Sequence, residues 1–196
     1  MFPDRLIYLI GQPGSGKSTL MSKLTLGMTR HAIAPCEGYP VALDVLTDKK
    51  TGVQLGVELG VRRGAFSGTD ALPSSIIDKA APWIASRPFT LVLAEGARLA
   101  NRRFLEAAID GGYHLTLALL DHDKAEDWRH KRSRKLGRTQ DAGWVKGRLT
   151  ASRNLADQLT TLSDPGREFH GKVDVLRGAP DDLFSRLAPL VSEQLP

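Results

Sequence analysis

The chain has 196 residues, a formal net charge of +5 and one cysteine, Cys36. This length accommodates one domain with a full apolar core and excludes a helicase built from two motor domains. A lone cysteine cannot form an internal disulfide, the first residues lack the pattern of a signal peptide, and no apolar run is long enough to span a bilayer. We therefore expect a cytoplasmic protein that folds as a single domain over 1–196, without a membrane partner, whose positive charge suits phosphate-bearing ligands.

The first strong pattern lies at residues 11–19, which read Gly-Gln-Pro-Gly-Ser-Gly-Lys-Ser-Thr. They match the phosphate-loop pattern G-x-x-x-x-G-K-[ST] at every fixed position. An apolar run at 6–10 predicts a buried strand before the loop, and Leu20, Leu24 and Met28 recur at helical spacing after it. The glycines allow successive backbone N–H groups to point toward an anion at the start of a helix. This stretch predicts a site for a nucleoside triphosphate.

The pattern also assigns a role to individual residues of the loop. Lys17 is expected to reach the β- and γ-phosphates, and the hydroxyl group of Ser18 is expected to hold Mg²⁺. The predicted ATP-binding residues are Gly11, Gly14, Ser15, Gly16, Lys17, Ser18 and Thr19.

The next part of the chain predicts a β-hairpin. Residues 31–39 are expected to form an irregular connection because they contain proline and glycine. Apolar residues then alternate with other residues at 41–46 and again at 53–61, on either side of a polar turn that ends in glycine. This alternation predicts a hairpin insert over about 40–61 with one apolar face. A small-residue loop and a helix at about 74–85 follow.

The remainder of the chain alternates strands with helices. Strands are predicted at 89–94, 115–120 and 173–176, and helices at 102–110, 124–135, 142–162 and 180–195. Such alternation is typical of a parallel sheet covered by helices on both faces. The predicted fold class is therefore α/β.

Two acids lie at the ends of predicted strands. Glu95 follows the strand at 89–94, and Asp121 follows the strand at 115–120. In an open α/β sheet, ligands bind beyond the carboxyl ends of the strands, where a carboxylate can orient Mg²⁺ directly or through water. We expect Glu95 to be this metal-orienting acid, with Asp121 as its competitor. The alternative for either acid is a helix cap or a solvated loop residue.

A basic run at 128–140 contains no acidic residue. Transfer of a phosphoryl group spreads negative charge over its oxygens, and mobile arginines that close over it stabilise that charge. The run therefore predicts a lid over about 124–140, with Arg134 and Arg138 as the preferred catalytic arginines. The alternative is a solvated basic face.

Two further aspartates are candidates for the general base or for a substrate anchor. Deprotonation of an attacking hydroxyl group is the work of a positioned carboxylate in many kinases. Asp70 lies in a glycine-containing loop that allows close approach of a ligand, although a helix N-cap explains it equally well. Asp44 lies on the less apolar face of its predicted strand, so an ordinary exposed residue is its alternative reading.

These features together resemble the small P-loop kinases, which include nucleoside, nucleotide and adenylylsulfate kinases. The resemblance rests on residues 11–19, the strand that ends in Glu95-Gly96, the arginine-rich region and the closing helices. Within this superfamily, residues 66–72 after the hairpin and residues 144–148 resemble phage-encoded proteins that phosphorylate 5-hydroxymethyluracil bases in DNA. The resemblance implies a three-layer P-loop NTPase fold, ATP and Mg²⁺ as cofactors and, for a phage-encoded protein, the host cytoplasm. The hairpin departs from the helical substrate-binding insert of typical nucleotide kinases, which disfavours a free mononucleotide as substrate.

The sequence therefore predicts an ATP-dependent kinase whose acceptor is a hydroxyl group, with a hydroxymethylated pyrimidine in DNA as the favoured acceptor. Alternatives are a kinase of nucleosides, nucleotides or metabolites, and a DNA-dependent ATPase. A regulatory GTPase is disfavoured because no Asn-Lys-x-Asp element is present. For a DNA substrate, Phe66 or Trp144 is expected to stack on the base. The expected contacts with the DNA backbone are Lys131, Arg132, Lys135, Lys146 and Arg148.

Overall fold

The computed structural model describes residues 3–62, 68–137 and 141–193. Its strands are β1 (Arg5–Gly11), β2 (Met28–Ile33), β3 (Leu43–Asp48), β4 (Gln54–Leu59), β5 (Leu91–Glu95), β6 (His114–Leu120) and β7 (Val173–Gly178). Its α-helices are α1 (Lys17–Leu24), α2 (Ile77–Ala85), α3 (Arg102–Asp110), α4 (Ala125–Leu136), α5 (Ala142–Ser163) and α6 (Pro180–Ser192). Two short 3-10 helices, η1 (Gly68–Ala71) and η2 (Ser74–Ile76), precede α2.

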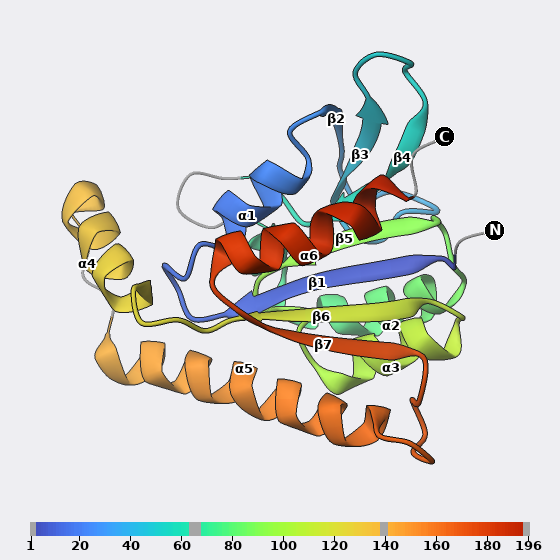
Figure 1. Cartoon of the computed structure of the whole chain (residues 1–196). Coiled ribbons are helices and arrows are strands. Elements are labelled where there is room, and N and C mark those ends of the chain that lie inside the picture. The colour runs from blue at the N-terminus through green and yellow to red at the C-terminus, as the bar shows by residue number, and fades with distance from the viewer. Residues whose placement is uncertain (1–2, 63–67, 138–140, 194–196) are drawn as a thin grey trace.

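The described strands form one sheet in the order β2-β3-β4-β5-β1-β6-β7 (Figure 1). The pairs β4–β5, β5–β1, β1–β6 and β6–β7 are parallel. The pairs β2–β3 and β3–β4 are antiparallel. The predicted hairpin is confirmed as β3 and β4. Because β4 also pairs in parallel with β5, the hairpin is part of the central sheet and extends it at one edge. The predicted α/β class, with its mostly parallel sheet, is confirmed.

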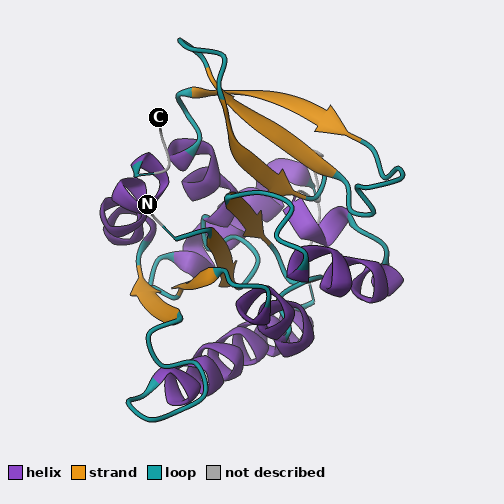
Figure 2. Ribbon diagram, turned by 90° about the vertical axis from the view of Figure 1, so that its right-hand side faces the viewer, coloured by secondary structure: helices purple, strands orange, loops and turns teal. Residues whose placement is uncertain are grey.

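Helices cover both faces of the sheet, as Figure 2 shows. Along β1, the side chains of Ile7 and Leu9 enter an apolar cluster with α1 and α6. Their neighbours Leu6, Tyr8 and Ile10 enter a second cluster with α2, α3 and α5. This alternation follows from the two-residue period of a strand, and burial on both sides explains why β1 reads as an unbroken apolar run. The carboxyl end of β1 is thereby fixed between two helical layers.

Two local predictions were wrong in the segment that follows α1. The helix ends at Leu24, and Met28 is the first residue of β2. Met28 is nevertheless buried in the same apolar cluster as α1, which explains why its spacing imitated a longer helix. Residues 31–33 belong to β2 and are paired with β3, so the expected irregular connection is shorter than predicted. Pairing with a distant strand overrides the weak local preference of these residues.

The basic helix α4 projects from one end of the sheet (Figure 1). Of its described side chains only Ala125 and Arg129, both in its first half, are buried. The helix follows β6, so its first turns lie at the same edge of the sheet as the phosphate loop. None of the helices in the described ranges is long and apolar enough to cross a lipid bilayer.

Candidate active site around the phosphate loop

The loop between β1 and α1 has the backbone geometry of an anion site. Gly14 and Gly16 adopt positive φ values of 83° and 98°, a region that glycine enters without steric cost. Gly16 is the N-cap of α1, and no side chain caps the helix there. The hydroxyl group of Ser15 is buried and has no hydrogen-bond partner among the described residues. A buried hydroxyl and an uncapped helix start both favour an anionic ligand that accepts hydrogen bonds.

Lys17 lies at the centre of a group of charges. Its Nζ atom donates hydrogen bonds to the carbonyl oxygens of Gly11 and Gln12, at 3.0 and 2.8 Å. Burial lowers the pKa of Lys17, and nearby Glu95 and Asp70 oppose this shift. The structure therefore brings Lys17 together with two of the acids that the sequence suggested.

Glu95 and Asp70 are held by different parts of the chain. Glu95 is the last residue of β5, is buried, and has Leu9 as its partner in the β1–β5 register. Asp70 lies in η1, where its Oδ1 atom accepts a hydrogen bond of 2.7 Å from the backbone N–H of Ala97. Asp70 thus caps a backbone group just beyond the end of β5, while its charge acts on Lys17.

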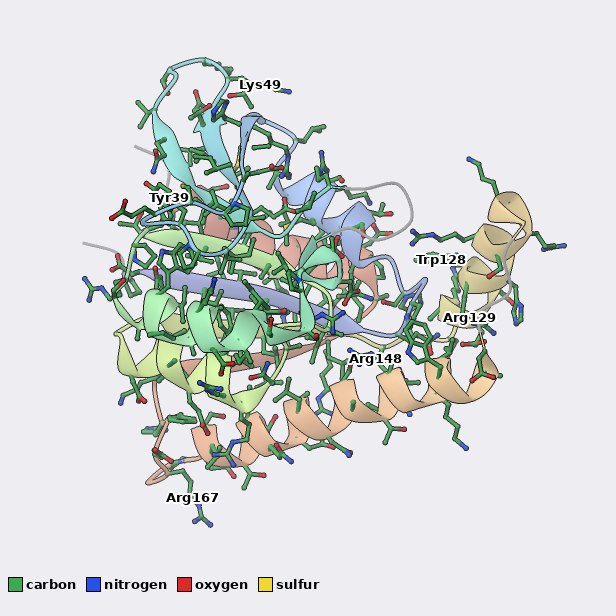
Figure 3. The ribbon with its side chains drawn as sticks, turned by 180° about the vertical axis from the view of Figure 1, so that it is seen from behind. Tyr39, Lys49, Trp128, Arg129, Arg148 and Arg167 are labelled. Carbon is green, nitrogen blue, oxygen red and sulfur yellow. The ribbon has the colours of Figure 1, made fainter. Side chains whose placement is uncertain are left out.

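Two arginines also act on Lys17, and they come from two different helices. Arg132 of α4 and Arg148 of α5 both lower the pKa of the lysine, as nearby positive charges do. In Figure 3, the side chain of Arg148 extends from α5 toward the sheet. Among the described residues no ion pair ties either arginine to an acid. Three cations therefore share one end of the sheet.

Of these charged groups, Lys17 and Arg132 line a cavity of about 280 Å³ next to the loop. Arg132 lines this cavity, whereas Arg134 is exposed farther along α4 and does not. Arg138, like Phe66, lies outside the described residues. The sequence placed Arg132 in the predicted lid and among the DNA contacts, and Arg148 only among the DNA contacts. The effect of both arginines on Lys17 depends on how α4 and α5 meet the loop. The cavity is lined by Gly14, Gly16, Lys17, Ser18, Thr19, Trp128 and Arg132.

Comparison with known proteins identifies the family. The sequence profile of the family described as P-loop Nucleotide Kinase3 matches residues 2–192. The chain belongs to this family. The protein is therefore a phosphotransferase of the P-loop kinase class, as its phosphate loop predicted. A comparison with curated proteins found no match. Among solved structures, an unliganded sugar kinase from Janibacter sp. HTCC2649 is similar, with 17% identity, a TM-score of 0.48, and coverage of 99% of this chain and 97% of that chain.

In this P-loop kinase, an aromatic side chain lies beside the phosphate loop. Trp128 of α4 is 37% exposed and lines the cavity. A Cβ atom added to Gly16 would lie 3.2 Å from its ring and 3.0 Å from the ring of Pro180. The imidazole of His122 packs against the indole, with 4.8 Å between ring centroids. Trp128 is a functional candidate that sequence reasoning missed, although an aromatic residue at the start of a basic run was a signal.

The first turns of α4 are attached directly to the loop of the kinase. The Nε2 atom of Gln12 donates to Glu126 at 2.9 Å, and Arg129 donates to the same carboxylate at 2.7 Å. These bonds hold the pKa of Glu126 below its usual range. Arg129 is buried and holds Glu126 within α4, while the bond from Gln12 to Glu126 joins the helix to the loop. The first arginine of the basic run is therefore satisfied locally.

The other two acids suggested by the sequence are paired with arginines. Asp121 accepts two hydrogen bonds from Arg153 of α5, at 2.6 and 2.9 Å, which lower its pKa. Asp44 is only 8% exposed and forms a 3.1 Å ion pair with Arg30, so the reading of Asp44 as an ordinary exposed residue was wrong. Neither acid is among the charges that shift the pKa of Lys17. Glu95 and Asp70 are thus the two acids whose charges act on Lys17.

Proposed function

We propose that this kinase transfers the γ-phosphoryl group of ATP to a hydroxyl group carried on a nucleic acid, with a 5-hydroxymethylpyrimidine base in DNA as the specific acceptor. The observation that carries the phosphoryl-transfer site is the group of three cations, Lys17, Arg132 and Arg148, contributed by three helices around one loop. Like charges at short range repel, and the two carboxylates of Glu95 and Asp70 are fewer than the three cations, so the group favours a further anion. A triphosphate supplies that anion.

Each part of the site has a distinct task in this proposal. Lys17, the hydroxyl group of Ser15 and the N–H groups at the start of α1 bind the β- and γ-phosphates. Arg132 and Arg148 stabilise the charge that spreads over the transferring phosphoryl oxygens. Trp128 offers a flat apolar face to the base of the nucleotide. Because α4 carries both Arg132 and Trp128, its position on the loop controls two of these contacts.

Ser18 and Glu95 are the residues proposed to hold Mg²⁺. A hydroxyl and a carboxylate oxygen suit this hard cation, which is usually bound by one or two protein groups together with phosphates. Within the described ranges, no group of three or more His, Cys, Asp and Glu side chains is placed to hold a metal ion by itself. When bound, the ion neutralises charge on the β- and γ-phosphates.

Asp70 is the proposed base or anchor for the acceptor hydroxyl. Its Oδ1 atom already accepts one hydrogen bond from Ala97. A carboxylate offers about four lone-pair sites, so Asp70 can accept a further hydrogen bond from a substrate hydroxyl group. The bond to Ala97 restricts the side chain and thereby fixes the direction in which the second oxygen points.

The choice of a nucleic-acid acceptor rests on charge and on the phage-kinase resemblance. Exposed cations continue beyond the phosphate loop along α4 and the start of α5. They outnumber what one triphosphate can use, and a polynucleotide backbone would neutralise them with release of counterions. The additional cations are Lys131, Arg134, Lys135 and Lys146.

A base inside a duplex must be flipped or unpaired to reach a kinase pocket.

The test is transfer of radiolabelled γ-phosphate from ATP to a panel of acceptors. The panel contains DNA with and without hydroxymethylpyrimidines, free nucleosides, nucleotides and sugars. We expect incorporation into hydroxymethylated DNA, and DNA binding that weakens steeply with salt. Equal or better transfer to a free nucleoside without salt-sensitive DNA binding would assign a small-molecule kinase. DNA-stimulated release of phosphate to water alone would assign an ATPase.

Arginine variants test the phosphoryl-transfer site independently of the acceptor. Arg148→Gln is expected to lower kcat about 10³-fold, the lower end of what a single catalytic arginine contributes in related chemistry. Arg167→Gln is the matched control, because Arg167 lies near the other end of α5 (Figure 3) and is exposed. Wild-type turnover in Arg148→Gln would remove this arginine from the site. Lys17→Ala serves as the inactive reference.

A further inference from the structure

The short helix η1 crosses the ends of β4 and β5 in direct contact with Glu95. A Cβ atom added to Gly68 would lie 2.6 Å from the Cγ atom of Glu95. A Cβ atom added to Gly60, at the end of β4, would lie 2.1 Å from the carbonyl carbon of Gly68. Real Cβ atoms do not approach other atoms so closely, so only glycine fits at both positions. The turn is therefore packed tightly against the acid that is proposed to orient Mg²⁺.

Thr69, the second residue of this turn, joins it to two strands. Its Oγ1 atom donates a 2.9 Å hydrogen bond to the carbonyl oxygen of Glu95. The hydroxyl group of Tyr8 in β1 lies 3.0 Å from the same Oγ1 atom. Because a threonine hydroxyl carries one proton, and this proton is donated to Glu95, the tyrosine must be the donor of the second bond. The three residues thus form a chain from Tyr8 to Thr69 to Glu95 with a defined direction.

This chain is protected from water. Tyr8 and Thr69 are fully buried, and Glu95 is 3% exposed. Burial raises the pKa of Tyr8, so its hydroxyl group keeps the proton that it donates. Neighbouring Asp70 accepts a hydrogen bond from Ala97. The turn consequently holds the backbone on both sides of Gly96, at the point where β5 enters the active site.

We propose that Thr69 is a positioning residue for phosphoryl transfer, which acts by fixing the backbone of Glu95 and hence the location of its carboxylate relative to Lys17. This inference rests on the role given to Glu95 in the proposed function. Thr69→Val keeps the shape of the side chain and removes the hydroxyl group, so the end of β5 loses its hydrogen bond. A displacement of about 1 Å at a reacting centre costs up to about 10²-fold in rate. We therefore expect kcat to fall about 10- to 100-fold while KM for ATP changes little, because the phosphate loop is untouched.

The experiment measures kcat and KM for Mg-ATP hydrolysis, with water as the acceptor, together with thermal unfolding. Thr69→Ser restores the hydroxyl group and is expected to recover most of kcat. Tyr8→Phe removes only the outer bond of the chain and is expected to lower kcat by less than Thr69→Val. Tyr113→Phe is its matched control, because Tyr113 is likewise a buried tyrosine whose hydroxyl group donates one hydrogen bond, in this case to the backbone carbonyl of Phe89. Thr116→Val is the control for Thr69→Val, since the buried hydroxyl of Thr116 has no partner within the described ranges.

The outcomes separate a positioning role from a structural one. A fall in kcat for Thr69→Val that Thr69→Ser reverses, at unchanged KM, supports the proposal. Thr69→Val with lower stability but wild-type kcat overturns it, as does a Thr69→Ser variant that is as slow as Thr69→Val. Glu95→Gln distinguishes failure of the positioning inference from failure of the role proposed for Glu95. If Glu95→Gln is inactive and Thr69→Val is fully active, only the positioning inference fails, whereas wild-type activity in Glu95→Gln overturns the role of Glu95 and the inference together.

Discussion

Substitution of Gly14 tests whether α4 rests on the phosphate loop. Gly14 has a φ value of +83°, and a Cβ atom added there would lie 2.7 Å from the Cα atom and 2.8 Å from the Cβ atom of Arg129. Gly14→Ala therefore has two costs: about 1–2 kcal/mol for a left-handed residue, and about 1–3 kcal/mol for a steric overlap that only a shift of α4 can relieve. The sum is about 2–5 kcal/mol.

Gly166→Ala separates these two costs. Gly166 has nearly the same φ value, +79°, but a Cβ atom added there would meet nothing within 4 Å. The control should therefore show only the conformational cost. For a chain of this size about 1 kcal/mol corresponds to roughly 3 °C in Tm, so Gly14→Ala should melt about 3–9 °C below Gly166→Ala.

Thermal unfolding and calorimetric titration with Mg-ATP together decide the point. Because Arg132 and Trp128 are carried by α4, a displaced helix should weaken ATP binding in Gly14→Ala and leave Gly166→Ala unchanged. Equal melting temperatures for the two variants would refute the contact between α4 and the loop. The same result would remove the basis for assigning Arg132 and Trp128 to the nucleotide site.

Two further predictions concern the base of the nucleotide and the acid Asp121. Trp128→Ala should weaken ATP binding about 5- to 150-fold in calorimetry, as expected for loss of base stacking, and should leave the binding of inorganic tripolyphosphate unchanged. Trp144 is another exposed tryptophan, and Trp144→Ala should alter the binding of neither ligand. The pKa of Asp121 is depressed in the folded state, so its pair with Arg153 contributes its full stability at pH values above the unfolded aspartate pKa of about 3.9. This contribution is lost as the pH falls through the lower pKa that Asp121 has in the folded protein. Asp121→Asn should thus lower stability by about 0.5–1 kcal/mol at pH 7 and by nearly nothing near pH 2, and a difference that persists at the lower pH would contradict this assignment.

Much of the fold was predictable because its signals are local. The helix at 102–110 was predicted with the boundaries that α3 has, since Asn101 caps its start and glycines follow its end. The strand before the phosphate loop was equally clear, because burial on both faces leaves an unbroken apolar run. The sequence did not predict the strand at 28–33, because this strand is stabilised by pairing with β3 and no pattern within its six residues reveals such a partner.

The sequence by itself determined that this protein belongs among the P-loop kinases and predicted residues 11–19 as its nucleotide-binding loop, because the fixed positions of that pattern lie within one short consecutive stretch. Only the tertiary structure decided which distant side chains join Lys17. Six arginines and lysines of the basic run looked alike in the sequence, yet Arg129 is paired with Glu126 inside α4 and Arg132 lines the phosphate cavity. Asp44 and Asp70 were similar candidates, but Asp44 is neutralised by Arg30 while Asp70 acts on Lys17. The physical reason is that charge interactions depend on distance and burial, and these are set by how strands and helices from separate parts of the chain pack together.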